Sequence, residues 1–252
     1  MSTELAWRKQ SAEPVLEEHD IHVWRIALDQ PEATIHRLQS TLSSDERERA
    51  ERFQFDRDRR RFISAHAALR MLLARYLASQ PNQIRFEYGA HGKPWLAANG
   101  VSDRIEFNLA HSGEYAVCGI TRYQPIGIDL EFMRPVLDAD QIVERFFSTQ
   151  ECATFRALPT DLKHATFFAG WTRKEAFIKA IGDGLSRPLD QFDVALAPGD
   201  PARIMSVGGS EREARNWSLF AFAPETNYVG AVAVASSEWS ISYWTWEFSN
   251  GA

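Results

Sequence analysis

The amino-acid sequence predicts an α+β fold built from two similar lobes that face each other. Helical patterns, in which apolar residues recur at three- and four-residue steps, come first in each half, and short strand patterns follow them. The chain has 252 residues, of which 44% are hydrophobic and 25% charged, enough for two small lobes with buried cores. The halves share this order of elements but no sequence repeat of fixed period. Two lobes of helices packed on strands are the simplest arrangement that gives this order.

The first half begins with a polar stretch, residues 1–19, which we expect to form a loose tail. The alternation over 21–28 predicts a strand, and Ser43 followed by Glu46 has the capping-box spacing of a helix start. A long helix is predicted over about 59–78, because its apolar residues follow the helical period. Short strands are predicted next, at residues 84–88, 106–109, 115–121 and 126–131.

The second half has helical patterns followed by strand patterns. The last and longest predicted helix ends at Gly182-Asp183-Gly184, which is typical of a helix C-terminus. The predicted helices cover residues 139–147, 148–158 and about 161–181. The predicted strands lie near 192–196, 218–222, 228–235 and 240–246.

The boundary between the lobes is expected near Gln124-Pro125, although no linker rich in Pro, Gly or Ser marks it. This boundary gives an N-terminal lobe over 20–125 and a C-terminal lobe over 126–252. Because both lobes belong to one chain, we expect the protein to act as a monomer.

Composition and charge exclude several classes of protein. The net charge of −6 argues against nucleic acid as the main partner, because binding to a phosphate backbone requires a basic face. We expect a cytoplasmic protein, since the first residues show no signal peptide and no apolar run reaches the ~20 residues of a membrane helix. Cys118 and Cys152 have neither disulfide nor zinc-site spacing. Arginines are concentrated between Asp45 and Arg75, where a local basic face could hold a small anionic ligand.

Three acidic residues predict a metal site. Asp129 and Glu131 are two positions apart in a predicted strand, so their side chains project from the same face. Glu175 lies in a predicted helix that could bring it toward them. Three hard oxygen ligands that converge on one point are typical of Mg²⁺, although oxygen ligands alone do not distinguish Mg²⁺ from Mn²⁺.

Each part of this acidic group also has an ordinary structural interpretation. The Asp-x-Glu pair could be a solvated strand edge, although acids in an otherwise apolar strand are rare unless they are paired or bind a metal. Glu175 and Lys179 are one helical turn apart, so they could form a simple ion pair. In the functional interpretation, Glu175 binds the metal and Lys179 contacts a phosphate.

Two turns add candidate phosphate ligands. A predicted strand ends in the polar turn Ala110-His111-Ser112-Gly113, where the ring N–H of His111 could donate to a phosphate oxygen. The turn around Gly92-Lys93-Pro94 presents one cation, and its alternative is a solvated hairpin loop.

Taken together, these segments resemble the 4′-phosphopantetheinyl transferases of the larger, surfactin-synthetase-activating type. The resemblance extends from about Leu42 to Leu196, and its segments occur in the family's order. They are Gly92-Lys93-Pro94, Phe107-Asn108-Leu109-Ala110-His111-Ser112, Ile126-Gly127-Ile128-Asp129-Leu130-Glu131, Arg145-Phe146-Phe147-Ser148, and Trp171-Thr172-Arg173-Lys174-Glu175-Ala176-Phe177-Ile178-Lys179 continuing to Gly184-Leu185.

The resemblance implies a pseudo-dimer of two α+β lobes with the active site between them. It also implies transfer of the phosphopantetheine arm of coenzyme A to a serine of an apo acyl or peptidyl carrier protein, with release of 3′,5′-ADP. The residues that match the Mg²⁺ ligands of the family are Asp129, Glu131 and Glu175. The residues that match its contacts with coenzyme A are His111, Lys93 and Lys179 at the phosphates and Arg49 and Arg61 at the nucleotide end.

The same resemblance implies catalytic roles and shows two departures. Glu175 is expected to act as the base, directly or through a water, while Lys179 and His111 stabilise charge on the phosphates. Ala110 stands where the family often has Ser, and Glu46 stands where some members carry a cation, so that Arg47 or Arg52 would have to compensate.

The sequence also offers one candidate docking site for the carrier and leaves two other functions to consider. The segment Phe132–Phe147 is either the packed side of a short helix or an exposed apolar lip for the carrier's helix. A non-catalytic nucleotide-binding module would not need three acids. A different Mg²⁺-dependent phosphotransferase or phosphatase would normally show a glycine-rich phosphate loop, which the sequence lacks.

Overall fold

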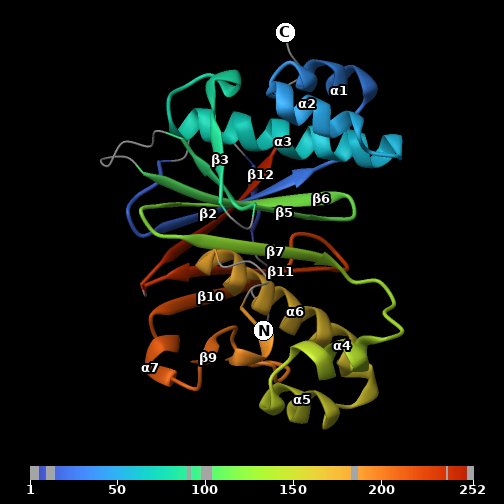
Figure 1. The fold of residues 1–252 in the computed structure, drawn as a ribbon, viewed down its shortest axis with the longest axis vertical. Helices are drawn as coiled ribbons and strands as arrows, with labels where there is room; N and C mark the ends of the chain where they lie inside the picture. Colours follow the sequence, from blue (N-terminus) through green and yellow to red (C-terminus); the bar gives the residue numbers. More distant parts are fainter. Residues whose placement is uncertain are drawn as a thin grey trace.

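The structure is a computed structural model, and it describes residues 6–9, 15–89, 92–97, 104–182, 187–236 and 238–248. Its main layers are two sheets that face each other, each covered on its outer side by helices (Figure 1). The α+β class predicted from the sequence is therefore confirmed. Part of the long-helix motif, at Gly184-Leu185, and His91 in the turn before Lys93 lie outside the described residues.

The larger sheet has five strands in the order β1-β12-β2-β6-β5. Strand β12 is parallel to both of its neighbours, and the other pairs are antiparallel. The strands are β1 (Arg8–Lys9), β2 (Asp20–Ala27), β5 (Ile105–Ser112), β6 (Tyr115–Arg122) and β12 (Ser240–Trp246).

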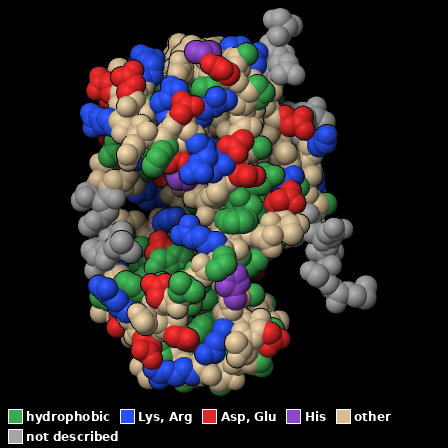
Figure 2. Space-filling view, turned by 90° about the vertical axis from the view of Figure 1, so that its right-hand side faces the viewer, with side chains coloured by type: hydrophobic (Ala, Val, Ile, Leu, Met, Phe, Trp, Pro, Cys, Tyr) green, Lys and Arg blue, Asp and Glu red, His purple; other side chains and the backbone are tan. Residues whose placement is uncertain are grey.

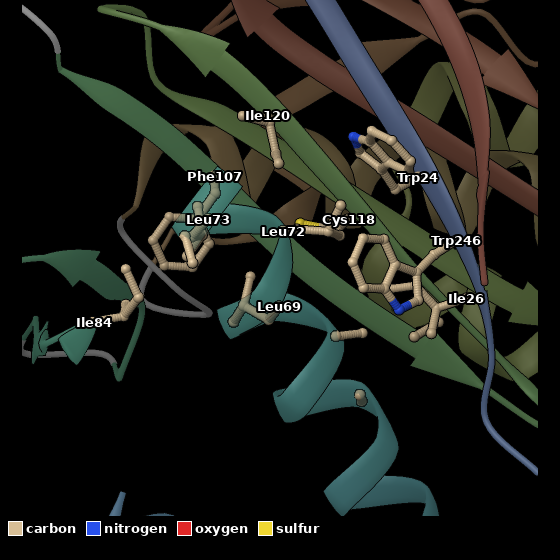
Figure 3. Close-up of a cluster of buried hydrophobic side chains, with 14 of the residues drawn as sticks. Trp24, Ile26, Leu69, Leu72, Leu73, Ile84, Phe107, Cys118, Ile120 and Trp246 are labelled. Carbon is tan, nitrogen blue, oxygen red and sulfur yellow. The ribbon is translucent and has the colours of Figure 1, made fainter. Parts of the chain in front are cut away.

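Three helices cover the outer face of this sheet: α1 (Glu32–Gln39), α2 (Ser44–Glu51) and α3 (Asp56–Tyr76). Helix α3 is amphipathic, and its side chains Leu69, Leu72 and Leu73 point toward Phe107 and Cys118 on the sheet (Figure 3). Helix α2 begins with the predicted capping box, in which Ser43 and Glu46 bond each other's backbone N–H groups.

The smaller sheet has three antiparallel strands in the order β10-β11-β7. They are β7 (Ile126–Phe132), β10 (Trp217–Phe222) and β11 (Tyr228–Ala235). On its outer side lie α4 (Ala139–Phe146), α5 (Thr149–Arg156) and α6 (Thr160–Ile181), with the short α7 (Glu211–Ala214) at one end. Two small hairpins complete the fold: β3 (Phe86–Tyr88) with β4 (Pro94–Leu96), and β8 (Phe192–Val194) with β9 (Ile204–Val207). Single 3₁₀ turns occur at Pro81–Gln83 and Leu189–Gln191.

The two sheets share a core. Ile128 and Leu130 of β7 pack with Ile21 and Val23 of β2 in one buried cluster. This contact settles the direction of the alternating side chains along β7: its apolar residues face the larger sheet, and Asp129 lies on the opposite face, toward α6.

One strand crosses the boundary that the sequence predicts. Strand β12, from the end of the chain, lies beside β2 in the larger sheet, whose other long strands come from the first half. The division of the chain near residue 125 stays a prediction. None of the helices in the described ranges is both long enough and apolar enough to cross a membrane.

Candidate active site

Close approach of β7 and α6 creates the site. A Cβ atom added at Gly127 would lie 2.1 Å from the carbonyl oxygen of Ala176 and 2.2 Å from the amide nitrogen of Ala180. Any larger side chain would push the helix away from the strand. The glycine therefore allows α6 to lie against β7, and this brings Lys179 next to Asp129 two residues further along the strand.

Asp129 is the most buried acid of the predicted group, at 6% exposure. Its Oδ1 accepts a hydrogen bond of 2.6 Å from the ammonium group of Lys179, whereas its buried Oδ2 has no hydrogen-bond partner among the described residues. Burial raises the pKa of Asp129, and the charge of Lys179 opposes this rise. A buried carboxylate oxygen without a partner needs an explanation, and a bound cation is one that suits it.

Glu131 lies at the end of the same strand and is held by Ser112 of β5. The Ser112 hydroxyl donates to Oε2 of Glu131 at 3.0 Å and accepts from the backbone N–H of Phe132 at 3.0 Å. Burial raises the pKa of Glu131, and the nearby charge of Asp129 raises it further. Ser112 thus fixes one oxygen of Glu131 and leaves the other for a ligand.

Glu175 approaches from α6. Burial raises its pKa, the positive charge of Lys179 lowers it, and the negative charges of Asp129 and Glu131 raise it. Glu175 is therefore close enough to the acids of β7 for their charges to affect its pKa. In the described part of the chain Lys179 makes its ion pair with Asp129, across to β7, rather than with Glu175 on its own helix.

The three acids fit a divalent cation in charge and in donor type, but they do not form a finished site. Within the described ranges, no three His, Cys, Asp or Glu side chains are grouped closely enough to hold a metal ion as they stand. The ammonium group of Lys179 occupies one oxygen of Asp129 instead. Hard oxygen ligands, repulsion among the acids and the unpartnered Oδ2 nevertheless favour a cation such as Mg²⁺.

His111 connects this acidic region with the helices of the other half. It lies near the end of β5, and its pKa is lowered by burial and further by the positive charges of His66, Lys179 and Arg49. The pKa of this histidine is therefore affected by charged residues of α2, α3 and α6. Arg49 itself lies over the Phe62 ring, with its guanidinium carbon 5.4 Å from the ring centroid.

Arg61 and His111 line one cavity of about 490 Å³, together with Arg57 and Arg134. Arg61 makes two hydrogen bonds of 2.7 Å to the carboxylate of Asp29. The cavity combines cations with apolar walls, which suits a phosphorylated ligand. On the face shown in Figure 2, Lys and Arg side chains gather at the waist of the molecule, where the surface is hollowed.

Lys93 is placed differently from the expectation of a free phosphate ligand. Its ammonium group donates to the backbone carbonyl of Ile126 at 3.0 Å and to that of Lys179 at 2.5 Å. Burial lowers the pKa of Lys93, and the charge of Glu106 opposes this. The lysine therefore ties the start of β7 to the end of α6, and one of its N–H groups remains for a ligand.

Glu46 has a structural role in the fold. It is buried, and its carboxylate accepts from Arg70 at 2.5 Å as well as from Ser43 in the capping box. Arg47, one of the two proposed substitutes for the missing cation, donates to the carbonyl of Leu42 at 2.7 Å.

A second cavity, of about 470 Å³, begins beside Glu131. The predicted docking segment is divided: Val143 and Phe147 are buried in a core cluster, whereas Leu137 is fully exposed at the cavity. The sequence reasoning missed the other wall, which α6 supplies through Phe167, Phe168 and Trp171. Arg134, which borders both cavities, and Ser112 were also not predicted as site residues. Each is a polar residue close in sequence to a predicted ligand, and this closeness could have identified it.

Comparisons with known proteins identify the family of this chain. Residues 125–233 match the model of the 4′-phosphopantetheinyl transferase superfamily, and residues 29–121 match the model of a 4′-phosphopantetheinyl transferase N-terminal region. The 4′-phosphopantetheinyl transferase HetI of Nostoc sp. is 40% identical over 238 residues, which cover 94% of this chain and 97% of the relative.

A more distant relative is the 4′-phosphopantetheinyl transferase Sfp of Bacillus subtilis. It is 34% identical over 176 residues, which cover 69% of this chain and 76% of that protein. Among solved structures, a holo-[acyl-carrier-protein] synthase of Thermotoga maritima is 19% identical, with a TM-score of 0.34 over 45% of this chain and 64% of that one.

Proposed function

We infer the reaction of this chain from the fact that it belongs to the 4′-phosphopantetheinyl transferase superfamily, as a member of the Sfp-like type. It is a transferase that attaches phosphopantetheine to carrier proteins. We propose that coenzyme A is the donor, that a serine of an apo acyl or peptidyl carrier is the acceptor, and that 3′,5′-ADP is released. With both halves of the site in one chain, the protein is proposed to act as a monomer.

In this proposal Asp129, Glu131 and Glu175 hold the metal ion, Mg²⁺ or Mn²⁺. The unpartnered Oδ2 of Asp129 and the repulsion among the acids support this assignment. A bound Mg²⁺ would neutralise charge on the pyrophosphate and on the leaving group. The role of the chain is to place the carboxylates: β7 fixes two of them on one face, and Ser112 orients Glu131.

Glu175 is proposed as the group that accepts the serine proton. Burial raises its pKa, the charge of Lys179 lowers it, and the charges of Asp129 and Glu131 raise it, so that it lies above the usual value for a glutamate. Lys179 and His111 are proposed to donate to phosphate oxygens as negative charge moves toward the leaving group. Lys179 is suited to this task because its side chain is 30% exposed beside Asp129.

The nucleotide end of coenzyme A is assigned to the cation-lined cavity. Arg61 uses its Nε and one Nη to hold Asp29, so its other Nη remains available for a phosphate oxygen. Arg49 and the remaining N–H of Lys93 are proposed as the further contacts. The cavity volume of about 490 Å³ lies within the range of sites for small molecules.

The carrier is proposed to dock over the second cavity, beside Glu131. Exposed Leu137 and partly buried Val136 and Ile142 face Trp171 across it, as expected for a groove that receives an apolar helix face. In this proposal part of the segment packs in the core and part forms the exposed apolar lip, and the buried residues hold the exposed ones in place.

The main support for the proposal is the buried, unpartnered Oδ2 of Asp129, on the same strand as Glu131, near a cavity lined by Arg57, Arg61, Arg134 and one acid, Asp58. The test is intact-mass spectrometry of an apo peptidyl carrier incubated with the protein, coenzyme A and Mg²⁺. We expect the carrier to gain one phosphopantetheine group, and we expect EDTA or Asp129→Ala to prevent the gain. Binding of coenzyme A without any gain on acyl or peptidyl carriers would instead favour a nucleotide-binding module.

A further inference from the structure

A group of cationic and imidazole side chains meets where α2, α3 and β5 come together. The ring of His66 on α3 stacks on the Phe62 ring, with centroids 4.0 Å apart and an interplanar angle of 29°. Arg49 of α2 lies against the same Phe62 ring. His111 at the end of β5 is influenced by the charges of both His66 and Arg49. His66 and Arg49, from two helices, thus contact one aromatic ring.

The orientation of His66 is fixed by Glu46. Nδ1 of His66 lies 3.1 Å from Oε1 of Glu46. Burial alone would raise the pKa of Glu46, but hydrogen bonds from His66, Ser43 and Arg70 lower it to about 2. Because the carboxylate is an acceptor, Nδ1 carries a proton and donates it to this bond.

The other ring nitrogen of His66 is available. Among the described residues, Nδ1 has the one hydrogen bond of this ring, to Glu46, and Nε2 has none. The side chain is 19% exposed, and its ring is packed on Phe62. An imidazole that is held on one nitrogen and open on the other is preorganised to bind a ligand through the open one.

The charges around His66 favour an anion. Glu46 is the carboxylate that faces it, and Glu46 is already shared with Arg70 and the backbone of Ser43. Arg49 and His111 add positive or donor groups without a further acid in contact with them in the described ranges. A phosphate would relieve this excess of positive charge and accept from several of these donors.

We propose that Nε2 of His66 contacts the 3′-phosphate of coenzyme A and so replaces the cation that is absent at Glu46. This inference rests on the proposed function. Coenzyme A has two phosphates in the reacting pyrophosphate, which belongs beside the acids of β7 and α6. The third phosphate is on the ribose at the nucleotide end, and His66 shares the Phe62 platform with Arg49, which is assigned to that end.

The test compares two variants on two donors. His66→Asn keeps an N–H near the Nδ1 position for Glu46 and removes the group at Nε2, whereas His66→Gln places an amide N–H near the Nε2 position. Each is assayed for kcat/KM with coenzyme A and with 3′-dephospho-coenzyme A, using an apo carrier and intact-mass detection. His36→Asn is the matched control, because His36 also pairs with an acid, Glu32, but on the exposed helix α1.

We expect His66→Asn to lower kcat/KM for coenzyme A about tenfold, as for the loss of one charge-assisted hydrogen bond, and to leave that for the dephospho donor unchanged. His66→Gln is expected to keep more of the preference for coenzyme A, and His36→Asn all of it. Equal losses on both donors would overturn the proposal, because a purely structural role predicts them, and so would unchanged kinetics on both. If the unaltered protein neither bound coenzyme A nor modified a carrier, the proposed function itself would be wrong.

Discussion

The ammonium group of Lys179 lies 2.6 Å from Oδ1 of Asp129, although 50 positions separate the two residues in the chain. This ion pair links helix α6, which carries Glu175, to strand β7, which carries Glu131. The lysine balances a buried carboxylate, and the pair holds its charge beside the proposed phosphate site.

Replacement of Lys179 tests the first of these roles. Lys179→Met should lower the free energy of unfolding by about 2 kcal/mol, because Asp129 would keep a buried charge without a partner. The measurement is the midpoint of urea unfolding. The control is Lys163→Met on the same helix, whose 3.2 Å pair with Asp140 is more exposed and should contribute less than about 0.5 kcal/mol. Equal midpoints for the two variants would show that the buried pair adds no stability.

Replacement of Glu175 tests the proposed base. Glu175→Gln should lower kcat by at least ~100-fold, the usual contribution of a general base, while the Kd for coenzyme A changes by less than about threefold. Single-turnover mass spectrometry gives the rate, and calorimetry gives the Kd. Parallel losses of rate and affinity would mean that Glu175 only binds the metal and substrate.

Replacement of Ser112 tests how Glu131 is oriented. Ser112→Ala removes the hydroxyl that holds Oε2 of Glu131, so the Mg²⁺ concentration for half-maximal binding should rise about tenfold. Calorimetric titration with Mg²⁺ measures this directly. Ser44→Ala is a suitable control, because the Ser44 hydroxyl contacts only the exposed Asp45 in the described structure. The proposed metal site would lose its support if both variants bound Mg²⁺ like the unaltered protein.

The local parts of the fold and site could be predicted from the sequence. The alternation along β7 correctly places Asp129 opposite Ile128 and Leu130, because side chains on any strand alternate. The spacing of Ser43 and Glu46 likewise predicts the capping box that begins α2. Both features depend on residues within a few positions of each other.

Contacts between distant segments could not be predicted from the sequence. Nothing in the residues of β12 shows that it pairs with β2, since strand pairing is decided by the tertiary fold. Lys93 lies in a turn typical of a free cation, yet two carbonyls that the fold brings to it occupy its ammonium group. In the sequence, Glu46 stands at a position where some members of the family have a cation. In the structure its buried carboxylate contacts Arg70 and His66 and orients the His66 imidazole.

His22 predicts a pH dependence of stability. Its Nδ1 shares a hydrogen bond of 2.7 Å with the Tyr76 hydroxyl, which also accepts from Trp24, and burial lowers the pKa of His22 to about 4 from 6.5. As the pH falls below 6.5, the unfolded chain takes up a proton there while the folded protein does not, so stability is lost between about pH 6.5 and 4. Relative to His22→Gln, the unaltered protein should lose about 2 kcal/mol more of its unfolding free energy between pH 7 and pH 5.

Urea unfolding at a series of pH values measures this difference, and the exposed His36→Gln variant should behave like the unaltered protein. Parallel curves for the His22→Gln variant and the unaltered protein would show that His22 titrates alike in the folded and unfolded states.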